Sequence, residues 1–192
     1  MDRFNVVQWS DMSELHKTQA IEMTKKAFGR GANFDESGYR GALDRGETQV
    51  GDVICRNNAL ALIDGDRCVA FVQAETLQKV LVINNAVSTF PESINDFLRL
   101  TGRTPMEELC TRIIRWGLDQ GCTTARPLNM TTEGKKFLSR IEAKWGIGDS
   151  RDNKDALPQP TDLKRLQATD IRTAGIDELE KGTRQQGRRD RQ

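Results

Sequence analysis

Three apolar segments joined by very short connections constrain the fold of this chain more than any other feature. Residues 58–63 (NALALI) and 67–76 (RCVAFVQAET) flank Asp64-Gly65-Asp66, and residues 79–89 (KVLVINNAVST) follow after two more residues. Asp-Gly is a strong signal for a tight turn between two strands. Strands on connections this short pair as antiparallel neighbours. The sequence therefore predicts a three-stranded antiparallel sheet in the middle of the chain.

A helix, a strand and a second helix are expected between residues 99 and 145. Residues 104–121 begin with threonine and proline, which suit the cap and first position of a helix. Apolar residues then recur at three- and four-residue spacing, which predicts one buried helix face. Residues 122–130 are too short and too uncharged for a helix, and residues 131–145 again start with capping threonines. This alternation is typical of an α/β domain.

The first half of the chain adds one strand and two helices. Residues 4–9 (FNVVQW) predict a strand. Residues 11–28 combine a capping-box pattern with an apolar stripe, and residues 35–45 predict a shorter helix. Residues 91–104 are expected to be a polar connection that carries a single helical turn at 92–98.

Residues 149–192 differ in composition from the rest of the chain. No aromatic residue occurs after Trp145, and the last twelve residues hold five basic residues against one acidic residue. We therefore expect one domain over residues 1–148 and an extended polar C-terminal arm over 149–192, with a short helix near 174–182. Two alternatives stay open for the arm: a solvated terminus, or a segment that orders on a neighbouring subunit or on nucleic acid.

Charge and cysteine usage exclude several classes of protein. The net charge of +1 gives the chain no field that would demand nucleic acid or a membrane, no apolar run could span a bilayer, and the N-terminus does not look like a signal peptide. We expect synthesis in the cytosol. Cys55, Cys68, Cys110 and Cys122 lack metal-binding spacing and are expected to be reduced core residues. His16 is expected on the surface, and no metal site is predicted.

The order of the expected elements, together with residues 99–145, resembles the GNAT fold of acyltransferases, which move an acyl group from coenzyme A to an amine. The resemblance covers residues 1–148. It implies an α/β (α+β) fold with a mixed, largely antiparallel sheet flanked by helices, to which the C-terminal arm is added.

In that family a loop of pattern R/Q-x-x-G-x-G/A leads into a helix and holds the pyrophosphate of coenzyme A. Here residues 99–104 (RLTGRT) stand before the expected helix. The resemblance implies that Arg99, Gly102, Arg103 and Thr104 bind the cofactor through backbone N–H groups and side-chain charge. Thr104 replaces the last small residue of the pattern, and Pro105 removes one N–H group.

Catalysis in that family needs a carboxylate or water chain to take the amine's proton, and often a tyrosine to protonate the leaving thiolate. Phe137 stands where that tyrosine is expected. Glu75 is the candidate base, the alternative being an outward residue of an alternating strand, and Tyr39 lies in the helix that lines the acceptor side. Asn84 and Asn85 are unusual inside a strand. They either face the cleft or form the bulge that splays the central strands.

Two hypotheses for function follow. The altered loop and the arm favour a structural or assembly protein: a degenerate acetyltransferase-like domain that uses no cofactor and serves as a scaffold, a phage virion component whose residues 149–192 dock on neighbouring subunits. The alternative is an active N-acetyltransferase that uses acetyl-CoA on a small amine or a protein N-terminus. Contact of the basic terminus with nucleic acid is a third hypothesis, which no basic helix face supports.

Overall fold

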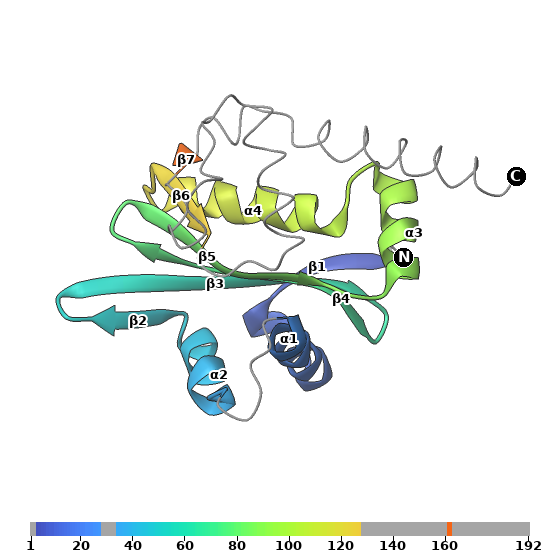
Figure 1. Cartoon of the computed structure of the whole chain (residues 1–192), viewed down its shortest axis with the longest axis horizontal. Coiled ribbons are helices and arrows are strands. Elements are labelled where there is room, and N and C mark those ends of the chain that lie inside the picture. Colours follow the sequence, from blue (N-terminus) through green and yellow to red (C-terminus); the bar gives the residue numbers. More distant parts are fainter. Residues whose placement is uncertain (1–2, 28–33, 128–160, 163–192) are drawn as a thin grey trace, which may run out of the picture.

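A single sheet forms the centre of the computed structural model, which describes residues 3–27, 34–127 and 161–162. Its strands lie in the order β1-β3-β4-β5-β6-β7, and β2 pairs with β3 (Figure 1). Neighbouring strands are antiparallel except for β5 and β6, which are parallel. The strands are β1 (Phe4–Gln8), β2 (Glu47–Val50), β3 (Val53–Asp64), β4 (Arg67–Leu77), β5 (Val80–Ser88), β6 (Thr124–Pro127) and β7 (Thr161–Asp162).

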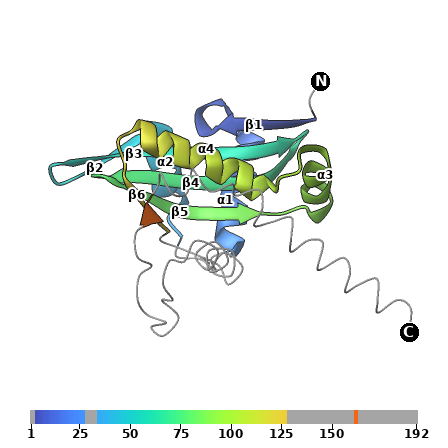
Figure 2. The ribbon, with the colours of Figure 1, turned by 90° about the horizontal axis from the view of Figure 1, so that it is seen from above.

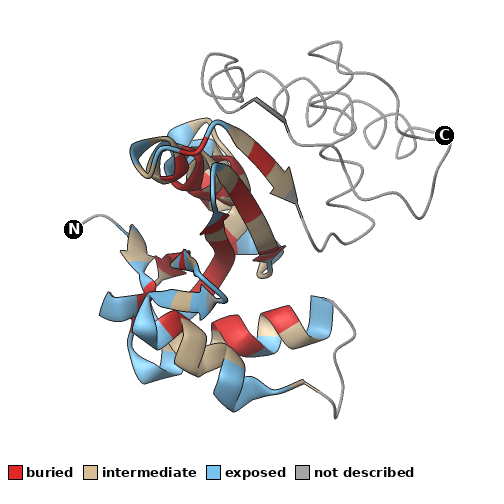
Figure 3. Ribbon diagram, turned by 90° about the vertical axis from the view of Figure 1, so that its left-hand side faces the viewer, coloured by how far each residue is buried: buried red, intermediate tan, exposed pale blue. Residues whose placement is uncertain are grey.

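Helices cover both faces of the sheet. Helix α4 (Pro105–Asp119) lies on one face, whereas α1 (Glu14–Ala27) and α2 (Glu36–Arg45) lie on the other, and α3 (Pro91–Thr101) stands at one end (Figures 1 and 2). Buried residues therefore line both sides of the strands (Figure 3). The core beneath α4 includes Leu62, Val72, Leu81, Leu109 and Ile113, and the core beneath α1 and α2 includes Trp9, Ile21, Leu43, Phe71 and Val87.

The expected fold class is confirmed: a mixed, largely antiparallel sheet lies between helices. The helices predicted over 11–28, 35–45 and 104–121 are present with shifted ends, and so are the three central strands. Strand β2 was not expected. Its sequence, ETQV, is polar, and it forms by pairing with the extended N-terminal half of β3.

Helix α3 corrects the prediction of a single helical turn between 92 and 98. The helix covers eleven residues because tertiary contacts hold it against the end of the sheet. Its Phe97 packs edge-on against Phe4 of β1, with 5.3 Å between ring centroids. Pro91 occupies the first turn, where its fixed φ favours helix. The short polar segment therefore owes its length to docking rather than to propensity.

Charged groups fasten α3 to the sheet as well. Arg3 donates to Asp64 at 2.8 Å and to Asp96 at 2.6 Å, and the Ser93 hydroxyl donates to Asp64 at 2.7 Å. Asp64 thus joins β1, the β3–β4 turn and α3. This junction fixes where α4 begins.

Several predictions lie outside the described residues. The helix expected over 131–145, with Phe137, is among them, and so is the helix near 174–182. Within the predicted arm only Thr161–Asp162 is described, as β7, which pairs antiparallel with β6. The domain boundary at 148/149 and the docking of 149–192 on other subunits stay predictions.

Gly117 marks the closest approach of α4 to the sheet. A Cβ atom there would lie 2.9 Å from Cδ2 of the fully buried Leu81, whereas one at Gly41 in α2 would meet only the Arg45 guanidinium at 3.2 Å. Alanine gains about 1 kcal/mol of helix propensity at either site, but overpacking costs about 1–3 kcal/mol. We expect Gly117→Ala to lower the free energy of unfolding in urea and Gly41→Ala to raise it. Equal effects from the two variants would contradict this packing.

Asp64 should make stability depend on pH. The Arg3 guanidinium, followed by the Ser93 hydroxyl, holds the pKa of Asp64 below its usual range. A lowered native pKa stabilises the fold above the unfolded value, about 4, and this contribution is lost as the pH falls through the native pKa.

We therefore expect Asp64→Asn to lower the free energy of unfolding at pH 7 and to flatten its fall below about pH 4. Urea titrations between pH 3 and 7 measure both effects. Asp66→Asn, in the same turn but exposed, is the control and should leave the pH profile unchanged.

Candidate active site

A β-bulge at Asn84 interrupts the centre of the sheet. Gln73 of β4 is opposite Asn85, but the next residue, Ala74, is opposite Ile83, so that Asn84 has no partner in β4. On its other side β5 pairs with β6 only through Val80–Ile83. From Asn84 to Ser88, that edge of β5 has no strand partner among the described residues. The bulge is one of the two alternatives expected for the asparagine pair, and it is confirmed.

A hydrogen-bonded polar cluster lies beside the bulge, on the face covered by α1 and α2. The Asn85 Nδ2 group donates to Gln73 Oε1 at 2.6 Å and to the Tyr39 hydroxyl oxygen at 3.1 Å. Asn85 is 2% exposed and Gln73 6% exposed. The Phe34 ring packs against Tyr39, with 5.2 Å between centroids. Sequence analysis missed Gln73, although a glutamine inside an apolar strand is the same kind of signal as the asparagines.

Two acceptors at the bulge have no donor. Asn84 Oδ1 and Asn85 Oδ1 are buried, and neither accepts a hydrogen bond within the described part of the chain. A buried polar atom left in this state costs about 1–3 kcal/mol. Native proteins leave few such atoms, so two on consecutive residues distinguish this bulge from the rest of the described sheet.

Glu75 lies on the same face as this cluster. Side chains alternate along a strand, so Glu75 follows Gln73 on the α1/α2 face of β4, opposite Asn57 of β3 and Val82 of β5. It is half-buried. Burial, and to a smaller extent the negative charge of Glu75, raises the pKa of the Cys55 thiol. The two predicted catalytic residues, Glu75 and Tyr39, therefore share one face of the sheet.

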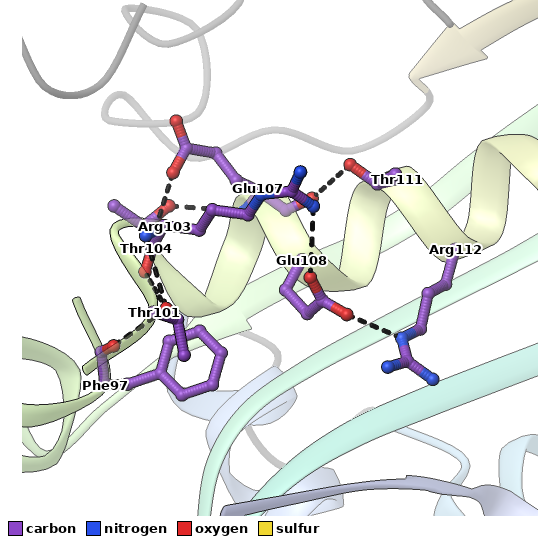
Figure 4. Close-up of polar contacts among 8 residues, drawn as sticks. All are labelled: Phe97, Thr101, Arg103, Thr104, Glu107, Glu108, Thr111 and Arg112. Carbon is purple, nitrogen blue, oxygen red and sulfur yellow. Dashed lines mark hydrogen bonds and ion pairs between the residues drawn. The ribbon is translucent and has the colours of Figure 1, made fainter. Parts of the chain in front are cut away.

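The four predicted cofactor-binding residues lie at the junction of α3 and α4. Figure 4 shows two of them, Arg103 and Thr104. Arg99 is in the last turn of α3 and pairs with Asp96 at 2.8 Å. Gly102 ends α3 with a φ of +68°, which favours glycine. Arg103 lies 3.5 Å from Glu108, and Thr104 is the N-cap of α4. Their role in binding stays a prediction.

A capping box occupies the N-terminus of α4 (Figure 4). Thr104 N–H donates to the Glu107 carboxylate, and Glu107 N–H donates to Thr104 Oγ1 at 3.2 Å. Arg103 N–H donates to Thr101 Oγ1 at 3.2 Å, and proline at 105 has no N–H. At most one amide of the first turn, that of Met106, is left for an anion. The carboxylate that the N-terminus of α4 binds is therefore that of Glu107 from the same helix. Glu107 is buried there, at 1% exposed.

Other chemistries find little support in the described residues. They contain no group of three side chains suited to a metal ion, and none of their helices is long and apolar enough to cross a membrane. Burial raises the pKa of the Cys68 and Cys110 thiols to about 12, so neither supplies a thiolate near neutral pH. His16 lies at the β3–β4 turn, with Nε2 3.1 Å from the Gly65 carbonyl oxygen.

Solved structures share this architecture. An acetyltransferase of the GNAT family from Staphylococcus aureus Mu50 matches with a TM-score of 0.51 and 9% identity, over 83% of this chain and 99% of that protein. An acetyltransferase from Streptococcus agalactiae 2603 matches with a TM-score of 0.50 and 11% identity, over 84% and 95%. The chain has the GNAT fold. An aminoglycoside N-acetyltransferase in complex with CoA is also similar, with a TM-score of 0.48 and 12% identity, over 81% and 95%.

Sequence comparison adds nothing to this result. No protein-family model matches the chain, and no curated protein sequence matches it significantly. The GNAT fold is therefore established through three-dimensional similarity at low identity.

The comparison corrects the structural or assembly hypothesis. The matching structures of this fold are acetyltransferases, which favours the alternative of an acetyl-CoA-dependent enzyme. The hypothesis had rested on the altered 99–104 loop and on the arm. The structure shows why that loop was a poor guide, because the bulge and its polar cluster lie elsewhere in the sheet. The expectation that the protein uses no cofactor followed from the same hypothesis and loses its basis. No comparison supports the prediction of a phage virion component.

The capping box gives a test of the α4 N-terminus. Thr104→Ala removes the acceptor of Glu107 N–H and should lower the free energy of unfolding by about 1 kcal/mol. Thr111→Ala is the matched control, since the Thr111 hydroxyl donates to a backbone carbonyl inside the same helix. Its loss should be neutral or slightly stabilising. Urea denaturation measures both variants. Identical stabilities for Thr104→Ala and the wild type would show that the capping box does not form.

Proposed function

We propose that the protein is an N-acyltransferase that transfers an acyl group from acetyl-CoA to an amine. The observation that carries the proposal is the bulge at Asn84 in β5, which lies beside a buried polar cluster. The GNAT fold supports the same reaction class.

No strand of the described residues pairs with β5 beyond Ile83 on the β6 side, and this edge suits an extended acyl carrier. Unpaired backbone N–H and C=O groups along a strand edge bind extended chains that carry amides. The pantetheine arm of coenzyme A is such a chain, with two amide groups. Residues 84–88 would hold this arm, which supplies the acyl group and a thiol leaving group.

The structure offers a less obvious site for the diphosphate of coenzyme A. Arg99, Gly102, Arg103 and Thr104 are the proposed contacts, but the amides of Thr104 and Glu107 are already engaged in the capping box. An anion bound there must share the first turn of α4 with the Glu107 carboxylate. The two arginines are the groups of this set that offer positive charge to it.

Acyl transfer to an amine forms a C–N bond and breaks the C–S bond of the thioester. The amine loses a proton and the thiolate gains one. Glu75 is the proposed base, because its carboxylate lies on the face that carries the polar cluster. Tyr39 is the proposed acid. Its oxygen accepts a hydrogen bond from Asn85, which holds the hydroxyl beside the bulge.

Acetyl-CoA binding and acetyl transfer test the proposal together. Isothermal titration should give a micromolar dissociation constant, about −8 kcal/mol, and thiol release in the presence of primary amines should report turnover. Glu75→Gln should retain acetyl-CoA binding and lower kcat by about 100- to 10,000-fold, the usual contribution of a general base.

Glu22→Gln is the matched control, since Glu22 is exposed on α1, and it should leave both quantities unchanged. The absence of both binding heat and thiol release in the wild type would refute an acyltransferase.

A further inference from the structure

One more side-chain atom near the bulge is buried without a partner, on a residue of intermediate exposure. Arg126 Nε, on β6, makes no hydrogen bond within the described residues. Arg126 is opposite Val82 of β5, and Val82 is opposite Glu75 of β4. Ala125, next to Arg126, packs in the core beneath α4, so Arg126 points to the other face. Glu75 and Arg126 thus lie on one face, two strands apart.

The asparagines stand just beyond this row. Asn84 and Asn85 follow Ile83, the last residue of β5 that pairs with the described part of β6, and both Oδ1 atoms lack a donor among the described residues. Asn85 cannot turn without losing its bonds, because Nδ2 already donates to Gln73 and to Tyr39. Its Oδ1 is therefore a fixed acceptor.

The groups without partners differ in charge and in hydrogen-bonding role from one side of this row to the other. Glu75 and the asparagine oxygens attract N–H donors, whereas the Arg126 guanidinium attracts an anion and matches a carboxylate in geometry. Neighbouring strands are about 4.8 Å apart, so the backbones of Glu75 and Arg126 are separated by roughly 10 Å. A molecule that contacts both side chains must carry one positive and one negative pole and pass over Val82, which lies between them on the same face.

We propose that the acceptor substrate is a small amine that carries a carboxylate, bound with its amine at Asn85 and its carboxylate at Arg126. The proposal rests on the acyltransferase function and names its substrate class. The amine nitrogen bonds to the acyl carbon, its proton passes to Glu75, and the thiolate takes a proton from Tyr39. Arg126 takes no part in the bond changes. It selects and orients the substrate.

Pairs of substrates that differ only in the carboxylate test this proposal. With acetyl-CoA as donor, thiol release is measured for L-alanine against ethylamine, L-phenylalanine against 2-phenylethylamine, and γ-aminobutyrate against propylamine. At least one carboxylate-bearing member should exceed its plain partner by about tenfold or more in kcat/KM. Comparison of the α-amino acids with γ-aminobutyrate shows which spacing of the two poles fits.

Variants locate the effect. Arg126→Met should lower kcat/KM for the preferred carboxylate-bearing amine by about 10- to 100-fold, mainly through KM, and change that for its plain partner by less than about twofold. Arg126→Lys should restore part of the loss. Asn85→Leu should lower kcat/KM for both members of the pair. Arg115→Met, exposed on α4, is the control, and acetyl-CoA titration shows that each variant is folded.

The outcomes separate the two proposals. Plain amines that react as well as their carboxylate-bearing partners, or an Arg126→Met variant that slows both equally, would overturn the substrate assignment and leave the acyltransferase intact. Transfer to none of the carboxylate-bearing amines would overturn it too. Failure to bind acetyl-CoA and to acylate any amine would instead refute the acyltransferase itself.

Discussion

The polar cluster on the face of the sheet covered by α1 and α2 depends on the extra residue at Asn84. Without it Asn84 would be opposite Gln73, and Asn85 would point to the face covered by α4. The inserted residue lets Asn85 face Gln73 and Tyr39. Bulges bend and twist a strand locally. One change in register thereby places the polar cluster on the face covered by α1 and α2.

The junction at α3 places the second half of the molecule relative to this bulge. Asp64 joins Arg3, the residue before β1, to Ser93 of α3, and the Phe4 and Phe97 rings pack against each other. Because α3 is held at the end of the sheet, α4 starts beside it and crosses β5, β4 and β3 (Figure 2). Gly117 then allows α4 to approach Leu81, just before the bulge. The core beneath α4 and the polar cluster with Gln73 and Asn85 therefore lie on opposite faces of the same strands.

Sequence analysis could predict what depends on local pattern. Alternation and the Asp-Gly turn gave the central strands, and Thr104 with Glu107 forms a cap that local sequence is sufficient to specify. Sequence analysis could not predict elements whose length depends on tertiary contacts. Helix α3 is long because it contacts Phe4 and Arg3, which are distant in sequence. Arg126 was missed for the same reason, since only strand pairing puts it on the face of Glu75.

The mistaken scaffold hypothesis has a physical explanation. It treated the loss of free amides at the start of α4 as the loss of function. The structure separates two sets of residues: Glu107 binds the amides at the helix N-terminus, while Glu75 and Tyr39, the proposed base and acid, lie on the opposite face of the sheet. A closed helix N-terminus lowers the attraction for an anion, but it leaves Glu75, Tyr39 and Asn85 where they are. Donor affinity and the chemistry of transfer can therefore change independently in this fold, and an altered phosphate loop is weak evidence against an enzyme.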